Sequence, residues 1–168
     1  MNFTINKAKV NAKVTKITGK NAVGAGKTIT LKATLNPAKS NANQTVNTKV
    51  TWKSNKTAIA KVDKNGKVTG VSAGKAKITV KAAGGSKSQT VTVYGIASKN
   101  LKQTVKAGKT KNVSANDTIK SAKSSNTKVA TVTYKGKKVV IKGVKKGTAK
   151  VTVTTKNGGK NVITVTVK

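Results

Sequence analysis

Apolar and polar residues alternate along most of the chain, in short runs separated by turn residues. The stretch "KVDKNGKVTGVSAGKAKITV" (61–80) shows this pattern around its Asn-Gly and Ala-Gly pairs. A period of two is typical of half-buried strands, because successive side chains of a strand point to opposite faces of the sheet. Valine, isoleucine and threonine dominate these runs, which also favours strands.

The same alternation predicts about seven short strands in each half of the chain. In the first half we expect strands near 12–18, 27–35, 48–54, 58–63, 67–71, 74–82 and 88–94. In the second half we expect them near 101–105, 109–114, 118–124, 128–133, 137–142, 147–155 and 160–168. Asn65-Gly66 predicts a two-residue hairpin turn, because both positions accept a positive φ.

The two halves are copies of one unit, with insertions and deletions between the strands. The matching segments are "WKSNKTAIAKV" (52–62) with "AKSSNTKVATV" (122–132), "GVSAGKAKITV" (70–80) with "GVKKGTAKVTV" (143–153), "VGAGKT" (23–28) with "VKAGKT" (105–110), and "QTVTV" (89–93) with "ITVTV" (163–167). Short strands separated by turns are typical of a small antiparallel sandwich. We therefore predict an all-β fold of two tandem β-sandwich domains, 12–95 and 96–168, preceded by an arm or extra strand at 1–11.

The segment "VTWKSNKTAIAKVDKNGKVTGVSAGKAKITVKA" (50–82) resembles the bacterial immunoglobulin-like domain, group 2. The resemblance lies in the Val-Ala-x-Val-type strand, the Asn-Gly turn, Val-Thr-Gly-Val and Ala-Gly-x-Ala-x-Ile-Thr-Val. It covers most of 12–94 and, less closely, 101–168, where Ala122 replaces the tryptophan. The resemblance implies an immunoglobulin-like β-sandwich of the kind found in adhesins, surface enzymes and phage virion proteins. It also implies no enzyme activity and no conserved active site.

Trp52 is the largest apolar side chain of the chain and lies on an alternating strand. Its indole suits either a platform that stacks on a sugar or a plug between two sheets. We favour the plug, because the family resemblance places a core residue at this position. The inward residues of the first sandwich are then expected to be Val50, Trp52, Ile59, Val62, Ile78, Val80 and Val91. Ala122 at the matching position predicts a thinner second core.

Charge is the feature that an ordinary sandwich does not explain. All 36 basic residues are lysine, the only acids are Asp63 and Asp117, and the formal net charge is +34. An AT-rich genome explains lysine in place of arginine, but glutamate would be coded readily there too. Self-repulsion at this charge opposes the compact state and is best tolerated beside counter-anions. The composition therefore predicts a polyanionic partner.

The residue types exclude most catalytic chemistry. The chain has no histidine and no cysteine, and its two carboxylates lie in different copies. General acid–base catalysis and calcium binding both need more groups than this, so we expect no enzyme activity, no cofactor and no metal site. The two Gly-Lys-Thr triplets (26–28 and 108–110) lack the earlier glycine of a phosphate-binding loop and are interpreted as turns. Asp63, beside the Asn-Gly turn, is interpreted as a turn residue and not as the acid of an isopeptide crosslink.

The lysines are therefore the candidate binding residues. Base readout usually depends on arginine and single-strand binding on aromatic stacking, so no sequence-specific nucleic-acid recognition is expected, although non-specific binding stays open. An exposed ion pair contributes only about 0–1 kcal/mol, so binding should depend on many lysines. The expected contacts are those clustered in turns: Lys61, Lys64 and Lys67 in the first copy, and Lys135, Lys137, Lys138, Lys145 and Lys146 in the second.

These observations favour a structural accessory protein that decorates a bacteriophage particle. It would bind an acidic capsid or tail surface, with anionic glycans as a second contact. The first residues lack the apolar region of a signal peptide, and no stretch has the length of a membrane helix, so we expect synthesis in the host cytoplasm and a final place in the virion. Two alternatives stay open: a fragment of an exported bacterial adhesin or surface stalk, and an engineered supercharged sandwich.

Overall fold

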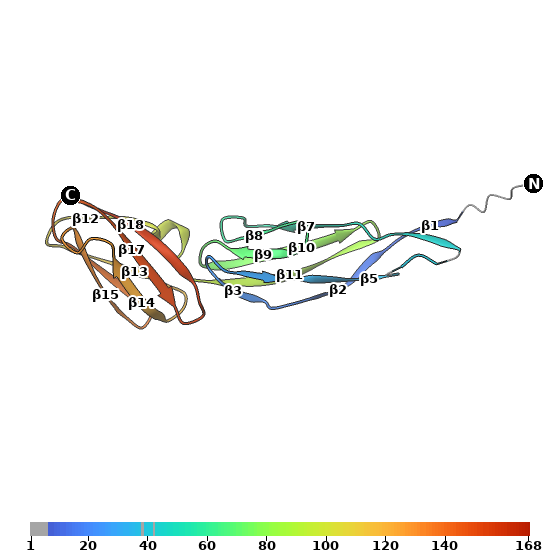
Figure 1. Ribbon diagram of the computed structural model, residues 1–168, viewed down its shortest axis with the longest axis horizontal. Helices are drawn as coiled ribbons and strands as arrows, with labels where there is room; N and C mark the ends of the chain where they lie inside the picture. Colours follow the sequence, from blue (N-terminus) through green and yellow to red (C-terminus); the bar gives the residue numbers. More distant parts are fainter. Residues whose placement is uncertain (1–6, 38, 42) are drawn as a thin grey trace, which may run out of the picture.

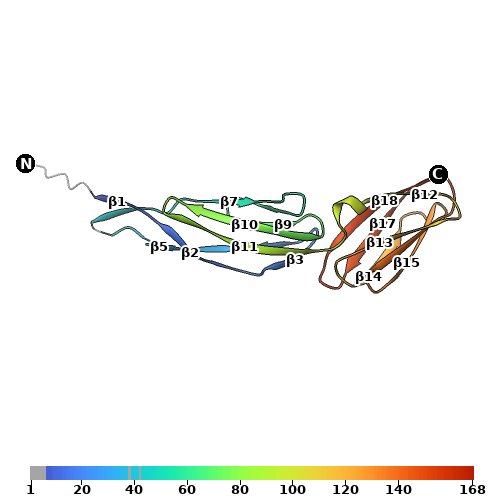
Figure 2. The same cartoon turned by 180° about the vertical axis from the view of Figure 1, so that it is seen from behind.

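The protein consists of two β-sandwiches that lie end to end in an elongated molecule (Figure 1). The computed structural model describes residues 7–37, 39–41 and 43–168. The view from behind shows the same order, with β1 at one end of the molecule and β12 and β18 in the sandwich at the other (Figure 2). The first part of the predicted arm, residues 1–6, lies outside the described residues.

The first sandwich is made by the strands up to Tyr94. They are β1 (Ala8–Asn11), β2 (Lys13–Thr18), β3 (Ala22–Gly24), β4 (Thr28–Thr30), β5 (Lys32–Asn36), β6 (Gln44–Asn47), β7 (Val50–Ser54), β8 (Ala60–Val62), β9 (Lys67–Gly70), β10 (Gly74–Ala82) and β11 (Gly85–Tyr94). Their sheets have the orders β3-β11-β10-β7, β4-β9-β8, β2-β5 and β1-β6. Residues 8–11 thus form a strand, parallel to β6.

One predicted strand of this sandwich is wrong. Residues 27–35 form two strands in different sheets, because β4 pairs with β9 while β5 pairs with β2. Leu31 lies between them, is 1% exposed, and its N–H donates to the Gly66 carbonyl. The buried Leu31 side chain thus marks the point where strand pairing ends with β9 and begins with β2.

The second sandwich repeats this plan with fewer strands. They are β12 (Lys102–Val105), β13 (Thr110–Ser114), β14 (Ile119–Ser124), β15 (Ala130–Lys135), β16 (Lys138–Gly143), β17 (Gly147–Thr155) and β18 (Lys160–Val167). The two sheets have the orders β12-β18-β17-β14 and β13-β16-β15. A single 3-10 turn, η1 (Ser98–Asn100), lies in the segment that joins the sandwiches.

Both cores are built from the inward positions of these strands. Ile78, Val80 and Val91 are fully buried, as predicted. The other predicted core residues, Val50, Trp52, Ile59 and Val62, are half-buried and pack against the buried clusters of the first sandwich. In the second sandwich the buried residues form one continuous cluster, against which Leu101 of the joining segment also packs; that this core is thinner than the first stays a prediction.

The turn between β8 and β9 differs from the prediction. It is a four-residue loop, 63–66, in which only Gly66 takes a positive φ, of 78°. Asp63 Oδ1 accepts hydrogen bonds from the N–H groups of Asn65 (2.8 Å) and Lys67 (2.9 Å). The interpretation of Asp63 as a turn residue is confirmed, while the two-residue turn is wrong because the Asp63 carboxylate stabilises a wider loop.

Candidate functional site

The lysines form a coat over both sandwiches, and every one of them is exposed. Strand β10 shows why: Lys75, Lys77 and Lys81 occupy the outward positions that alternate with buried alanine, isoleucine and valine. Because side chains of a strand alternate between its faces, a strand that buries its apolar residues must present these lysines to solvent. The pattern that builds the core therefore also builds the cationic surface.

In the four-stranded sheets lysine is paired with threonine or serine, except for Lys87, which is paired with Val80. Lys53 faces Thr79 between β7 and β10, and Lys123 faces Thr152 at the matching place of the second sandwich. Like charges directly opposite one another destabilise a sheet. The alternation of lysine with threonine keeps the ammonium groups apart while retaining a high charge density.

The predicted binding lysines fall into three groups. Lys61, Lys64 and Lys67 surround the β8–β9 hairpin of the first sandwich. The second group lies at the β15–β16 turn of the second sandwich, where Lys135 is paired with Lys138 and Lys137 lies between them. Lys145 and Lys146 lie beyond the other end of β16. The five lysines predicted in the second copy are therefore not one cluster.

The two acids are both engaged in backbone turns. Asp63 holds its own loop, while Asp117, 8% exposed, holds the loop between β17 and β18. Its Oδ2 accepts from the Asn157 N–H (2.8 Å), and its Oδ1 accepts from the Thr118 N–H (2.8 Å) and from Asn157 Nδ2 (3.1 Å). Burial opposes the charge of Asp117, but hydrogen bonds from Asn157, Thr155 and Thr118 outweigh it and lower the pKa of this carboxyl.

The joint between the sandwiches is a close backbone contact. A Cβ added at Gly24 would lie 2.5 Å from the Gly158 carbonyl carbon, so a side chain does not fit there. A Cβ at Gly159 would likewise collide with the Tyr94 carbonyl oxygen. The Lys160 N–H donates to the Ala25 carbonyl across the joint (2.8 Å).

Two asparagine side chains fix the joining segment. Asn161, 6% exposed, accepts a hydrogen bond from the Ile96 N–H (2.8 Å). Asn116 accepts from the Gly95 N–H and donates to the Val93 carbonyl, both at 2.8 Å. The arrangement of the two sandwiches is thus fixed by the buried contact of Asn161, the part-buried contacts of Asn116 and the close packing of glycines.

The joint was not predicted from the sequence, although the repeat carries one signal of it. The matched segments "VGAGKT" and "VKAGKT" differ at Gly24 and Lys106. Gly24 lies in the joint, whereas Lys106 is exposed at the far end of the second sandwich. A glycine that replaces lysine in one copy of a repeat indicates a place where another backbone approaches closely.

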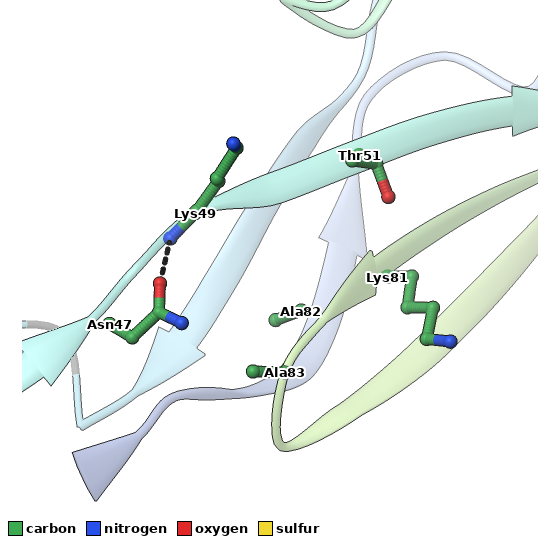
Figure 3. A pocket seen from close by; sticks show the side chains of 6 residues that line it. All are labelled: Asn47, Lys49, Thr51, Lys81, Ala82 and Ala83. Carbon is green, nitrogen blue, oxygen red and sulfur yellow. Dashed lines mark hydrogen bonds between the residues drawn. The ribbon is translucent and has the colours of Figure 1, made fainter. Parts of the chain in front are cut away.

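A shallow cleft of 330 Å³ lies at the start of β7 and the end of β10 (Figure 3). It is lined by Asn47, Lys49, Thr51, Lys81, Ala82 and Ala83. The Lys49 N–H donates to Asn47 Oδ1 (3.2 Å), as drawn in Figure 3. With two ammonium groups and no acid in its lining, the cleft can attract an anion but offers no group for acid–base catalysis.

Among residues 7–37, 39–41 and 43–168, no group of acids could ligate a metal ion. Nor does this part of the chain contain a helix long and apolar enough to cross a membrane. The candidate binding surface is the lysine coat of the two joined sandwiches.

Comparison with known proteins identifies the type of domain. The model of the bacterial Ig-like domain (group 2) matches residues 6–93. No curated protein matches the chain.

Solved structures that match the chain include domains 4 and 5 of the S-layer protein SbsC, which are 19% identical with a TM-score of 0.38, over 93% of this chain and 99% of that one. A longer SbsC fragment (31–844) is 18% identical with a TM-score of 0.36, over 94% of this chain and 28% of that one. The C-terminal 282-residue fragment of intimin, solved with the intimin-binding domain of its translocated receptor, is 19% identical with a TM-score of 0.35, over 92% and 64%. The chain thus spans less than two thirds of these two longer structures.

Proposed function

This chain belongs to the bacterial Ig-like domain family of group 2, and we propose that it is a non-enzymatic structural accessory protein attached to the acidic surface of a larger assembly. The assembly we favour is a bacteriophage particle, with the protein on its head or tail. Domains of this family occur in surface proteins and are generally non-catalytic.

The observation that carries this proposal is the unneutralised charge. All lysines are exposed, and both carboxylates are engaged in turns of their own fold. A compact protein with a net charge of +34 repels itself, and an acidic surface relieves this repulsion on contact. Each exposed ion pair contributes about 0–1 kcal/mol, so the attachment must involve many lysines at once.

The end-to-end arrangement supports a second candidate, a module of a bacterial surface protein. Two firmly joined sandwiches make a spacer, which suits a stalk that holds a binding domain away from a cell. In that case the acidic partner is an anionic polymer of the envelope, and the cell surface replaces the virion as the location.

Sedimentation of a native lysate separates these candidates. The organism that carries the gene is lysed at low salt, and particles and envelope fragments are resolved on a sucrose gradient and analysed by mass spectrometry. We expect the protein to sediment with phage particles and to be released progressively as salt rises to about 1 M, where the screening length falls to roughly 3 Å.

Two results would contradict the proposal. Sedimentation with envelope fragments identifies the surface-protein candidate instead. Retention on the particles through molar salt shows that the attachment is not electrostatic, because a hydrophobic interface holds or tightens under these conditions.

A further inference from the structure

One pair of lysines breaks the charge pattern of the sheets. At the paired positions of the described strands, lysine faces threonine, serine, asparagine or an apolar residue, as Lys61 faces Thr69 and Lys150 faces Thr164. The exception is the last row of β15 and β16, where Lys135 lies directly opposite Lys138. Cβ atoms of directly opposite residues lie about 4.5–5.5 Å apart, and like charges there destabilise the sheet.

This row belongs to an extension found only in the second sandwich. The β8–β9 hairpin of the first sandwich ends at the pair Val62–Val68. The matching β15–β16 hairpin continues past Val132–Ile141 and ends at Lys135–Lys138. The unfavourable pair is thus an addition to the repeat.

The turn that carries the pair is held in place by the rest of the sandwich. The Ile119 N–H donates to the Gly136 carbonyl (2.8 Å), and the Ala115 N–H donates to the Lys137 carbonyl (2.9 Å). The Tyr134 hydroxyl donates to the Lys120 carbonyl (3.0 Å). Because the backbone of the turn is fixed, the spacing of the three lysines at 135, 137 and 138 along it is set before any partner binds, so the main chain loses little entropy on binding.

We infer that the β15–β16 turn is a focal binding site for the carboxylates of an acidic protein segment, with Lys135, Lys137 and Lys138 as its contacts. This inference rests on the proposed function and names the place where attachment is strongest. A carboxylate between Lys135 and Lys138 removes the repulsion of the pair, so these lysines gain more from an anion than lysines that face threonine.

The sheet favours a polypeptide over a phosphate polymer at this site. Strand β15 is at the edge of the sheet β13-β16-β15, and Lys135 is its last residue. An extended peptide can add main-chain hydrogen bonds along such an edge, whereas a polyphosphate has no donor for them.

The test uses the full chain, hexaglutamate as the probe, and two variants that each lose one charge. Lys135→Thr restores the lysine–threonine arrangement used elsewhere, and Lys53→Thr, on the outer face of β7, is the matched control. Binding at low salt is followed by two-dimensional NMR of the backbone amides, and the melting temperature of each variant is measured.

We expect the amide shifts to concentrate on residues 133–139. Lys135→Thr should weaken hexaglutamate binding about threefold, whereas Lys53→Thr should change it less than about 1.5-fold. At low salt Lys135→Thr should also raise the melting temperature by about 1–4 °C, because it removes the repulsion. That gain should vanish near 1 M salt, where the screening length is roughly 3 Å.

Equal weakening by both variants, with shifts spread over both sandwiches, would overturn the focal site and leave the proposed electrostatic attachment intact. Shifts at the turn with polyphosphate and none with hexaglutamate would overturn the assignment of the partner as a protein. If neither hexaglutamate nor polyphosphate binds the wild-type chain at low salt, both the focal site and a charge-driven attachment are wrong.

Discussion

The two sandwiches share strand order and the lysine–threonine face but differ at the end of their last hairpin. In the first, β10 and β11 are joined by Ala83 and Gly84 alone, and the Gly84 N–H donates to the Ala12 carbonyl (3.0 Å). In the second, the longer loop 156–159 is held by Asp117 and packs against the first sandwich. The end of this hairpin therefore contacts the first sandwich's own β1–β2 segment in one copy, and in the other copy it forms the joint between the sandwiches.

This difference shows which positions of the repeat differ between the two copies and which stay the same. Most positions that face the core keep an apolar residue, as with Ile78 and Val151, and some outward lysines are kept, as with Lys53 and Lys123. Positions at the ends of the sandwiches change: Gly24 in the joint is Lys106 at the free end. The central sheets thus fix the fold, and the hairpin ends decide how each sandwich meets its surroundings.

The largest loss of unfolding free energy is expected at the core position where the two sandwiches differ most, Trp52 in the first and Ala122 in the second. Trp52 packs against both buried clusters of the first sandwich, whereas its counterpart Ala122 lies at the edge of one continuous cluster. Trp52→Ala should lower the free energy of unfolding of the first sandwich by about 3 kcal/mol, at the low end for a large aromatic because the indole is half-buried.

Urea unfolding followed by two-dimensional NMR reports the two sandwiches separately and checks this prediction. Ala122→Gly is the companion variant and should cost the second sandwich about 1 kcal/mol. A loss below about 1 kcal/mol for Trp52→Ala would mean that the indole is a surface platform and not a core plug.

A substitution in the joint between the sandwiches should have the next largest effect on stability. In Gly24→Ala the new methyl group must displace the loop of the second sandwich, so we expect a loss of about 2 kcal/mol and independent motion of the sandwiches. Small-angle scattering and NMR relaxation measure this motion. Lys106→Ala is the matched control and should stay within about 0.5 kcal/mol of wild type. Unchanged relative tumbling in Gly24→Ala would show that the glycine contact does not set the joint.

Asp117 should make the stability of the second sandwich depend on pH. The fold lowers the pKa of this carboxyl, so its stabilisation is fully present at neutral pH. It is lost as the pH falls below about 4 and through the lowered pKa. Asp117→Asn should therefore cost about 1–2 kcal/mol at pH 7, and the gap to wild type should close at acid pH.

Urea unfolding at neutral and acid pH measures this gap. Asp63→Asn is the control, because an asparagine oxygen can still accept the backbone hydrogen bonds of an exposed turn. A gap for Asp117→Asn that persists at the lowest pH would mean that the carboxylate charge is not what holds the loop.

Strands with clear alternation could be predicted from the sequence, as could the outward direction of the lysines. Strands β3 and β6 could not, because each is short and β6 lies within 36–48, a segment with the single proline that has no counterpart in the second copy. The break at Leu31 was missed because periodicity does not show where a strand changes its partner sheet.

The joint and the pair Lys135–Lys138 were missed for a different reason. Gly24 and Gly159 meet only once two folded sandwiches are placed end to end, so the exchange of Gly24 for Lys106 indicates a close approach but not the segment that approaches. Lys135, Lys137 and Lys138 were predicted as contacts, but only strand register shows that two of them are directly opposite. Register depends on the whole hairpin and its turn.

The smallest effect tests whether equivalent positions in the two copies behave alike. Asn55 Oδ1 accepts a hydrogen bond from the Lys77 N–H (2.8 Å), and Ser125 Oγ accepts one from the Lys150 N–H (2.9 Å). Both bonds tie the loop after an edge strand to the neighbouring lysine-bearing strand, and both loops are exposed. Asn55→Ala and Ser125→Ala should each cost about 0.5–1 kcal/mol, each in its own sandwich. Residue-resolved hydrogen exchange can measure losses of this size at the amides of Lys77 and Lys150. A loss in only one of the two variants would show that the other copy holds this loop through a different contact. The two copies would then share their strands but not the hydrogen bonds that hold this loop.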